Sequence, residues 1–386
     1  MRKIKWYIRL IFPFLLSVTT CIEPFEPDST KYENVLVVDG LITNLQESYK
    51  VELSRSIPYQ DFSPDPEIGA EVYIVDEDGV STPLHEVKPG IYMTDSLEIR
   101  GEIGRKYKLL IITSDLESYE SDYVELQSVP EIDTLYYKYE EVETSDPNNP
   151  LQGAQIYLST HDPDNKTWYY RWEWLETWEF TTPFVASGRI NLYRCWRSLE
   201  SRSINTATSK RLTQDLIKDH PLNYISQQSN RLSIMYSILV RQYSLSSEAY
   251  AFWKSLENVN QNMGSLFDPT PTSVLGNLHH VEDPEHPVLG YFQASAVTTK
   301  RLFIDRTDLP KEMVVSSGYD YCDLLIAENP EEEEIEAIVR NNWIYLDNYT
   351  IGPTTYYRFT NSISCYDCRT KGTTKRPLFW PDDSEY

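Results

Sequence analysis

Basic residues are scarce in this chain of 386 residues, which has 35 Lys and Arg against 59 Asp and Glu and a formal net charge of −24. A protein that binds nucleic acid needs a basic patch to meet the phosphate backbone, and the sequence has none. The same scarcity argues against attachment to an anionic membrane surface through basic charge. We therefore expect no nucleic-acid partner.

Glycine is also scarce, with 14 residues, whereas aromatic residues are abundant, with 29 Tyr and 9 Trp. Aromatic residues favour strands and contact surfaces over helices. The hydrophobic fraction of 40% and the charged fraction of 24% are ordinary for a folded protein, and the length indicates two or three domains. The composition predicts an acidic, aromatic-rich, mainly β protein.

The common catalytic motifs are absent from the sequence: it has no GxSxG, HExxH, Walker A or GxGxxG. His279, His280 and His286 stand close together, but their spacing matches no standard zinc pattern. Paired carboxylates say little about glycosidase chemistry in a chain so rich in acids. We therefore predict no enzymatic activity, no cofactor and no metal. A hydrolase that uses these histidines is the enzymatic alternative.

The first 20 residues have the pattern of an export signal. Four basic residues precede a short apolar stretch at residues 10–18, which is too short to span a bilayer. Cys21 follows directly, as in a bacterial lipoprotein signal, so we predict lipidation of Cys21 after cleavage of residues 1–20; the alternative is an ordinary secreted protein. Cleavage removes four basic and no acidic residues, and changes the net charge from −24 to −28. Residues 21–33, rich in Pro and acids, are predicted to form a flexible tether.

The cysteines after Cys21 are suited to an exported protein. Cys195, Cys322, Cys365 and Cys368 can form two disulfides in three possible connectivities. Cys365 and Cys368 form a CxxC, but the thioredoxin-like context of a redox motif and the second ligand pair of a zinc site are both missing. We predict structural disulfides, with free or metal-bound thiols as the alternative.

Short strands separated by turns fill residues 34–128. Residues 50–54 alternate polar and apolar, and Asp78-Gly79 is a strong hairpin turn. This region is predicted to be an Ig-like or transthyretin-like β-sandwich. Residues 129–386 are predicted to form a second β-rich domain with inserted helices, of α+β type.

Three helices are expected in the second domain. The clearest spans residues 247–263, with Ser246 or Ser247 as its cap and an apolar stripe that includes Phe252 and Trp253. A second begins at Pro330, where the following glutamates favour the positive end of the helix dipole. A third, short helix is expected at residues 215–220.

The strand at residues 168–180 has aromatic residues at alternate positions. Side chains of one parity point to one face of a strand, so these aromatics share a face. They are Trp168, Tyr170, Trp172, Trp174, Trp178 and Phe180. The first interpretation is a core strand with a solvated outer face. The second is that Trp174 and Trp178 form an exposed platform for a partner or a sugar ring.

Several segments resemble one known family. They are VDGLIT at 38–43, VELSR at 51–55, GSLFDPTPTSVLGN at 264–277, GYFQASAV at 290–297 and SCYDCRTKGTTKRPLFWPDD at 364–383. With the lipoprotein signal, they are similar to DUF4249, a Bacteroidetes lipoprotein family of unknown function. The resemblance implies an outer-membrane lipoprotein, with its folded part facing the cell surface, and a TonB-dependent receptor as partner. The family has no established catalytic residues.

These observations predict a lipid-anchored binding protein of the outer-membrane surface that assists a TonB-dependent receptor in the capture or uptake of a substrate. The alternative is a surface glycan-binding or adhesion protein, which the aromatic content favours.

Overall fold

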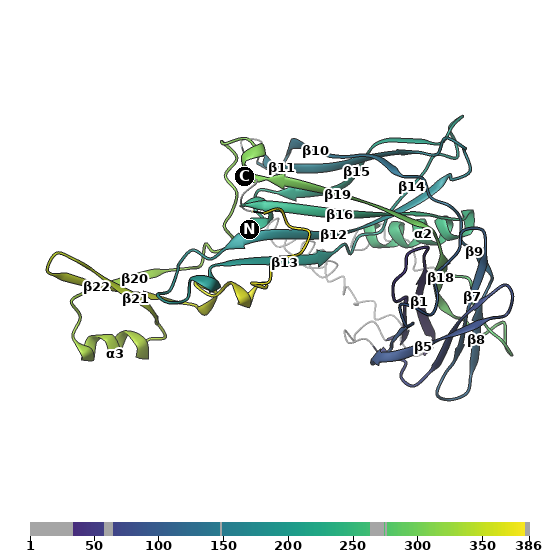
Figure 1. The fold of residues 1–386 in the computed structure, drawn as a ribbon, viewed down its shortest axis with the longest axis horizontal. Helices are drawn as coiled ribbons and strands as arrows, with labels where there is room; N and C mark the ends of the chain where they lie inside the picture. The colour runs from purple at the N-terminus through teal and green to yellow at the C-terminus, as the bar shows by residue number, and fades with distance from the viewer. Residues whose placement is uncertain (1–33, 58–64, 147–148, 263–273, 275, 383–386) are drawn as a thin grey trace, which may run out of the picture.

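The computed structural model describes residues 34–57, 65–146, 149–262, 274 and 276–382, which form the mainly β protein that the sequence predicts (Figure 1). Cys21, the predicted signal and the predicted tether lie outside these residues. Within the described part of the chain, no helix is long and apolar enough to cross a membrane. The described residues form three parts: the N-terminal sheet, the central sheets and the arm.

The N-terminal sheet has the strand order β17-β8-β7-β4-β5-β6-β2-β1-β18, with β3 beside β2 and β9 beside β7. Alternate residues of its strands point inward, as Leu36, Val38 and Ile42 do in β1. Side chains from β1 and β2 pack in the same core as those from β4 and β7, so the two halves of the sheet enclose one core. The strands are β1 (Leu36–Ile42), β2 (Lys50–Arg55), β3 (Asp65–Pro66), β4 (Glu71–Asp76), β5 (Ser81–Lys88), β6 (Ile91–Met93), β7 (Lys106–Ile112), β8 (Ser118–Ser121), β9 (Val124–Glu125), β17 (Leu278–His280) and β18 (Leu289–Ala294).

Two strands of the N-terminal sheet, β17 and β18, come from beyond residue 128, where the sequence analysis ends the first sandwich. β18 pairs in parallel with β1. At the start of this pairing Gly290 has φ +100°, and a Cβ there would lie 1.8 Å from the carbonyl oxygen of Val38, so no larger residue fits. The Asn277 side chain adds two bonds of 2.9 Å, donating to the Phe292 carbonyl and accepting from the Phe292 N–H.

The central sheets pack face to face. One has the order β10-β11-β15; the other has the order β13-β12-β16-β19, with β14 beside β12. Ile156 of β11, Trp172 of β12 and Ile238 of β16 belong to their common core. The predicted helix at 215–220 is wrong, because these residues mostly belong to β15. The elements are β10 (Ile132–Val142), β11 (Leu151–His161), β12 (Tyr169–Thr181), β13 (Arg194–Glu200), β14 (Asn205–Thr208), β15 (Leu216–Ser226), β16 (Met235–Ser244), β19 (Val297–Asp305) and the 3-10 turns η1 (Ile190–Leu192), η2 (Asn230–Leu232) and η3 (Arg306–Asp308).

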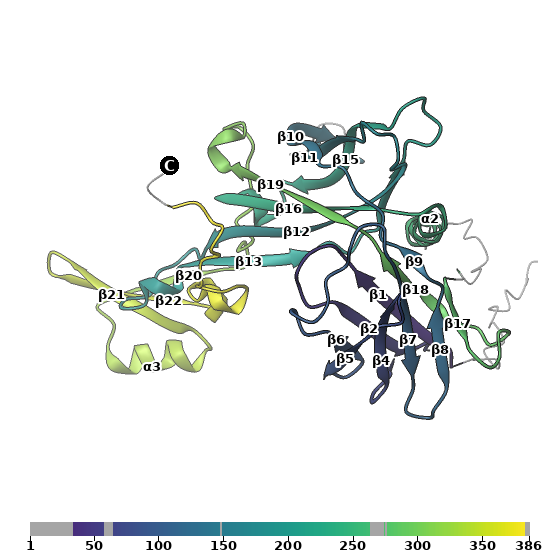
Figure 2. The same cartoon turned by 45° about the vertical axis from the view of Figure 1, so that its right-hand side comes forward.

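Helix α2 (Ser247–Asn262) joins the N-terminal sheet to the central sheets (Figure 2). It contacts β12 and β14 on one side and β18 on the other. Ser246 caps it, accepting a hydrogen bond of 3.1 Å from the Ala249 N–H, which is one of the two predicted caps. Phe252 is buried against Tyr291 of β18, with ring centroids 4.9 Å apart. The predicted apolar stripe therefore packs between two sheets.

The arm consists of β20 (Leu324–Glu328), α3 (Glu332–Arg340), β21 (Ile344–Ile351) and β22 (Thr354–Thr360), with the strand order β20-β22-β21. In Figures 1 and 2 it projects from the end of the central sheets that faces away from the N-terminal sheet. Helix α3 starts two residues later than predicted, after Glu331, and its first turn carries three glutamates near the positive end of the helix dipole.

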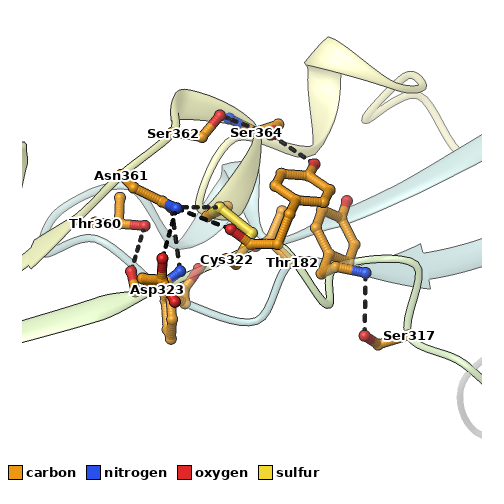
Figure 3. The surroundings of a disulfide bond; sticks show 12 residues. Thr182, Ser317, Cys322, Asp323, Thr360, Asn361, Ser362 and Ser364 are labelled. Carbon is orange, nitrogen blue, oxygen red and sulfur yellow. Dashed lines mark hydrogen bonds between the residues drawn. A yellow bond between two sulfur atoms is a disulfide. The ribbon is translucent and has the colours of Figure 1, made fainter. Parts of the chain in front are cut away.

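One disulfide joins the C-terminal segment to the central sheets, and a second closes the base of the arm. Cys195 of β13 is bonded to Cys368 in η5 (Cys368–Thr370), and Cys322 is bonded to Cys365 in η4 (Ile363–Cys365). Figure 3 shows the second bond, beside which Asn361 donates to the Asp323 carboxylate at 3.1 Å. The two cysteines of the CxxC have different partners, so they do not form a redox pair with each other, and none of these four sulfurs is a free thiol.

Candidate functional site

The predicted tryptophan platform is wrong. Trp174 and Trp178 are each only 4% exposed and belong to the core between the central sheets. The aromatic face of their strand, β12, packs against the other central sheet, because both rings share a core with Ile156 of β11. The other interpretation, a core strand, is correct for both residues. Neither ring is open to a sugar or to a partner.

The three neighbouring histidines do not form a metal site. His279 and His280 lie in the edge strand β17, and the His280 ring is 5.4 Å from that of His286. Nδ1 of His280 accepts hydrogen bonds from two backbone N–H groups of the following turn, at 3.2 and 2.9 Å, so this nitrogen is already used. Among the described residues, no group of three or more His, Cys, Asp or Glu side chains is placed to hold a metal ion.

A cavity of about 480 Å³ lies between the N-terminal sheet and the central sheets. Its walls come from β1 and the loop that follows it, from β12 and β16, from residues 200–204 and from α2. Ligand pockets occur preferentially at such junctions, and their volumes are roughly 300–1,000 Å³. We take this cavity as the candidate functional site.

Strand alternation explains which side chains reach the cavity. In β1 the buried residues alternate with Asp39, which points outward. In β12 the aromatic face fills the core, so Arg171 and Glu173 lie on the opposite face. In the neighbouring β16, Tyr243 pairs with Arg171 and Arg241 pairs with Glu173. Residues opposite each other in adjacent strands have Cβ atoms about 5 Å apart, so these four side chains form one cluster.

Arg171 is the best-buried charged group of the cavity, with a side chain that is 7% exposed. Its guanidinium lies 4.0 Å from the ring centroid of Trp253 and 5.1 Å from that of Tyr243, and its Nη1 lies 3.0 Å from Oε1 of Glu173. Its Nε is buried and makes no hydrogen bond with the described residues. The ion pair and the two rings hold the guanidinium in place.

Most aromatic rings of the cavity are buried, and Trp253, which is partly exposed, has one side of its ring covered. Trp172 is fully buried, Tyr49 and Tyr243 are 2% exposed, and one ring side of Trp253 carries the Arg171 guanidinium. The polar ends are also used: the Trp253 Nε1–H donates to Gln293 at 2.8 Å, and the Tyr243 hydroxyl donates to Glu173 at 3.1 Å. Recognition here therefore depends on charge and hydrogen bonding.

Charges of both signs line the cavity in equal number. The acids are Asp39, Glu47, Glu173 and Glu200, and the bases are Lys50, Arg171, Arg202 and Arg241. This balance differs from the whole chain, whose net charge is −24.

Five of these eight groups make no ion pair with the described residues: Asp39, Glu47, Glu200, Arg202 and Arg241. Asp39 lies on the exposed side of β1; desolvation raises its pKa, whereas the nearby Arg171 and Lys50 lower it. Arg241 makes no ion pair with the described residues; burial lowers its pKa, but Tyr243 and Glu200 raise it by more. The surroundings of Arg241 therefore favour its charged form.

The two loops at the cavity rim are held by hydrogen bonds. Ser201 exchanges two bonds with Trp174: its N–H donates to the Trp174 carbonyl at 2.8 Å, and its Oγ accepts from the Trp174 N–H at 3.1 Å. Asn44 accepts from the Val297 N–H at 2.7 Å through its side chain and from Arg100 at 2.8 Å through its carbonyl. These bonds preorganise the rim, which reduces the entropy cost of binding.

None of the cavity residues is predicted from the sequence to form a site. One signal is present in the sequence: Asp39 is an acid within the otherwise apolar run of residues 35–42. The polar face of β12 is interpreted there as a solvated surface, because nothing in the sequence shows that the N-terminal sheet and α2 cover it.

Together the fold and the cavity define a mainly β protein with a polar, charge-balanced cavity between two sheet systems. The chain belongs to the DUF4249 family: the family model, described as a domain of unknown function, matches residues 22–301. This range contains all of the cavity residues and ends before the arm, so the segment at 364–383 lies outside it. A comparison with curated proteins finds no match.

Proposed function

We propose that this protein is a lipid-anchored binding protein of the outer-membrane surface that captures a small polar ligand for a TonB-dependent receptor. The observation that carries the proposal is the cavity, which has a suitable volume, held rim loops and charged groups without partners. The anchor rests on the sequence around Cys21, and the receptor rests on the resemblance to the family. The proposal involves no chemical step on the ligand.

The glycan-binding alternative has lost the observation that favours it. It depends on exposed Trp174 and Trp178, and both are buried. The rings around the cavity do not replace them, because they are covered by protein groups. We therefore carry only the small-ligand proposal forward.

The ligand-binding part is tested by filling the cavity. Leu41 lines the cavity from β1, and Leu41→Trp would add a large ring there. The matched control is Leu378→Trp, at a fully exposed position of the C-terminal segment. The purified proteins are incubated with a low-molecular-weight extract of spent growth medium and analysed by native mass spectrometry. We expect a bound mass on the wild type and the control that is absent from the cavity variant. Equal capture by all three proteins, or by none, contradicts the proposal.

The anchor and the receptor are tested in the native host. We expect a C-terminally tagged chain to incorporate labelled palmitate and to copurify with an outer-membrane TonB-dependent receptor from detergent extracts. Cys21→Ser should lose the label and the membrane fraction. Labelling that persists in this variant argues against the anchor, and recovery of no receptor from wild-type membranes argues against the partner.

A further inference from the structure

We propose that one face of the arm is a docking surface for a partner protein whose contact region is apolar at its centre and basic at its border. The identity of that partner rests on the proposed function, under which it is the TonB-dependent receptor. Three features of the arm support this assignment: the way it is held, the side chains it exposes and the charges it leaves unpaired.

The arm is held at its base and extends away from the rest of the protein (Figures 1 and 2). The Cys322–Cys365 disulfide joins the segment before β20 to the segment after β22. Arg358 of β22 forms an ion pair with Asp347 of β21 and donates to the Val185 carbonyl at 3.3 Å. A sheet that is already held in place loses little conformational entropy when a partner binds it.

One face of the arm sheet, which we call the open face, is apolar and exposed. Side chains at alternate positions of a strand, and those opposite each other in neighbouring strands, share a face. By this rule the open face carries four exposed apolar side chains: Leu324 is 40% exposed, Ile326 45%, Tyr349 39% and Ile351 65%. Ala327 and Phe359, which are buried, lie on the opposite face.

The open face continues across all three strands of the arm. In the central strand β22, Tyr356 stacks on Tyr349 of β21, with ring centroids 5.3 Å apart. Arg358, also on β22, lies 5.9 Å from the ring centroid of Tyr349 and opposite Ile326 of β20. Aromatic residues and Arg are enriched in protein–protein interfaces, and a contiguous exposed apolar patch marks an interaction site.

The charges of the arm determine which kind of partner fits. Residues 324–360 contain seven acids and two bases. Both bases are paired within the arm, Arg340 with Glu336 and Arg358 with Asp347. The other five acids make no ion pair with the described residues; they are Glu328, Glu331, Glu332, Glu333 and Glu334. Glu328 lies on the open face itself. Charge complementarity therefore requires basic groups at the border of the partner's contact region.

Other partners fit this surface less well. An anionic lipid surface or a nucleic acid would be repelled by the five unpaired glutamates. A second copy of the chain would bring its own net charge of −24 against them. A partner protein with a basic border meets both the apolar side chains and the acids.

Photo-crosslinking in membranes from the native host tests the docking surface. A benzophenone amino acid replaces Tyr349 on the open face or, at the control position, Leu97, which is 84% exposed in the N-terminal part. We expect an adduct from position 349 that is at least tenfold stronger than any from position 97. Mass spectrometry should place the crosslink on a partner surface bordered by Lys and Arg. Added salt should weaken the adduct, because salt screens exposed charges.

Two variants separate the apolar contact from the charge. Ile326→Ser/Ile351→Ser removes two exposed apolar side chains and should reduce the adduct from position 349 at least tenfold. Glu328→Lys reverses one exposed charge and should reduce it at least threefold. All three positions are exposed, and the melting temperature of each variant shows that it is folded.

The matched controls lie in the loop between β6 and β7 of the N-terminal sheet. Leu97→Ser/Ile103→Ser removes two exposed apolar side chains there, and Glu98→Lys reverses one exposed charge. Both controls should leave the adduct from position 349 unchanged.

The docking surface and the receptor proposal fail in different ways. If the receptor copurifies equally with the wild type and with Ile326→Ser/Ile351→Ser, the docking surface is wrong and the receptor stands. If position 349 crosslinks to the basic surface of a different protein and no receptor copurifies, the receptor is wrong and the docking surface stands. An adduct with a second copy of the chain, or none above the control at Leu97, overturns the docking surface.

Discussion

Asp39 holds a carboxylate on the exposed side of β1, near Arg171 and Lys50, which both lower its pKa. Desolvation outweighs them and raises the pKa above the ordinary value of 3.8. Because the pKa of Asp39 is higher in the folded state than in the unfolded state, its protonation favours folding. This contribution to stability is complete below pH 3.8 and is lost as the pH rises through the pKa of the folded state. At neutral pH the ionised carboxylate is therefore a cost to stability.

Asp39→Asn should raise the melting temperature of the unliganded protein at neutral pH only slightly, because the amide removes a desolvated charge but the exposed position leaves most of that charge hydrated. The gain should shrink as the pH approaches 3.8. Scanning calorimetry across this range measures both effects, with Asp122→Asn as the exposed control. A lower melting temperature at neutral pH would mean that Asp39 supports the fold.

His220 is a second residue whose titration the fold controls. Burial lowers its pKa to about 4; its Nε2 lies 2.8 Å from Oδ1 of Asn205, and its ring is 4.7 Å from that of Trp172. Between pH 6.5 and pH 4 the unfolded chain binds a proton there that the folded chain does not, so stability falls as the pH falls. A shift of this size corresponds to at most about 3 kcal/mol.

His220→Gln should remove this pH dependence while keeping a neutral hydrogen-bonding group. Urea unfolding at neutral pH and at pH 4 should show a loss of unfolding free energy that is smaller in the variant, by up to about 3 kcal/mol. The exposed His85→Gln should behave like the wild type. Equal losses in all three proteins would show that His220 does not contribute.

At the scale of elements, local sequence signals correctly predict local structure, namely where a helix forms and which side chains of a strand share a face. The 3.6-residue stripe and the Ser246 cap predict α2, and the alternation of aromatics predicts which face of β12 they share. The same alternation does not say which face is covered, so the platform at Trp174 and Trp178 was wrong. The segment at 215–220 has no periodic apolar stripe, and its pairing with β11 overrides any local helix preference.

Four cysteines allow three disulfide connectivities, and the sequence does not choose among them. The structure has one of the three, Cys195–Cys368 with Cys322–Cys365. Cys195→Ala/Cys368→Ala should lower the unfolding free energy by about 2–5 kcal/mol, because the bond joins positions 173 residues apart and restricts the unfolded chain. Cys322→Ala/Cys365→Ala opens a separation of 43 residues and should cost about 1 kcal/mol less on the same model. Denaturant unfolding compares the two double variants. A larger loss for the second pair would show that local contacts of the arm outweigh the loop length.

At the scale of the whole molecule, the sequence analysis has no signal for the crossing of the chain from the central sheets back to the N-terminal sheet. Parallel pairing of β18 with β1 joins residues far apart in sequence. Nothing in the sequence of either strand indicates which strand it pairs with. The cavity depends on this crossing, because it places β1 against β12 and β16. The composition and the strand patterns therefore predict the fold class, and the long-range packing that creates the site could not be predicted from them.

The returning strands should be indispensable to the N-terminal sheet. They supply Phe292, which is fully buried in its core, and they cover the edge of β1. Loss of one buried Phe side chain costs about 3–5 kcal/mol, against a total stability of about 5–15 kcal/mol for a typical domain. Residues 34–128 produced alone should therefore lack cooperative unfolding and tend to aggregate through the open β1 edge.

The same fragment joined through a glycine-rich linker to residues 276–297 should give a dispersed NMR spectrum and one unfolding transition. Cooperative folding of residues 34–128 alone would mean that β17 and β18 only dock onto a sheet that is already complete, and then the walls of the cavity could separate without unfolding either part.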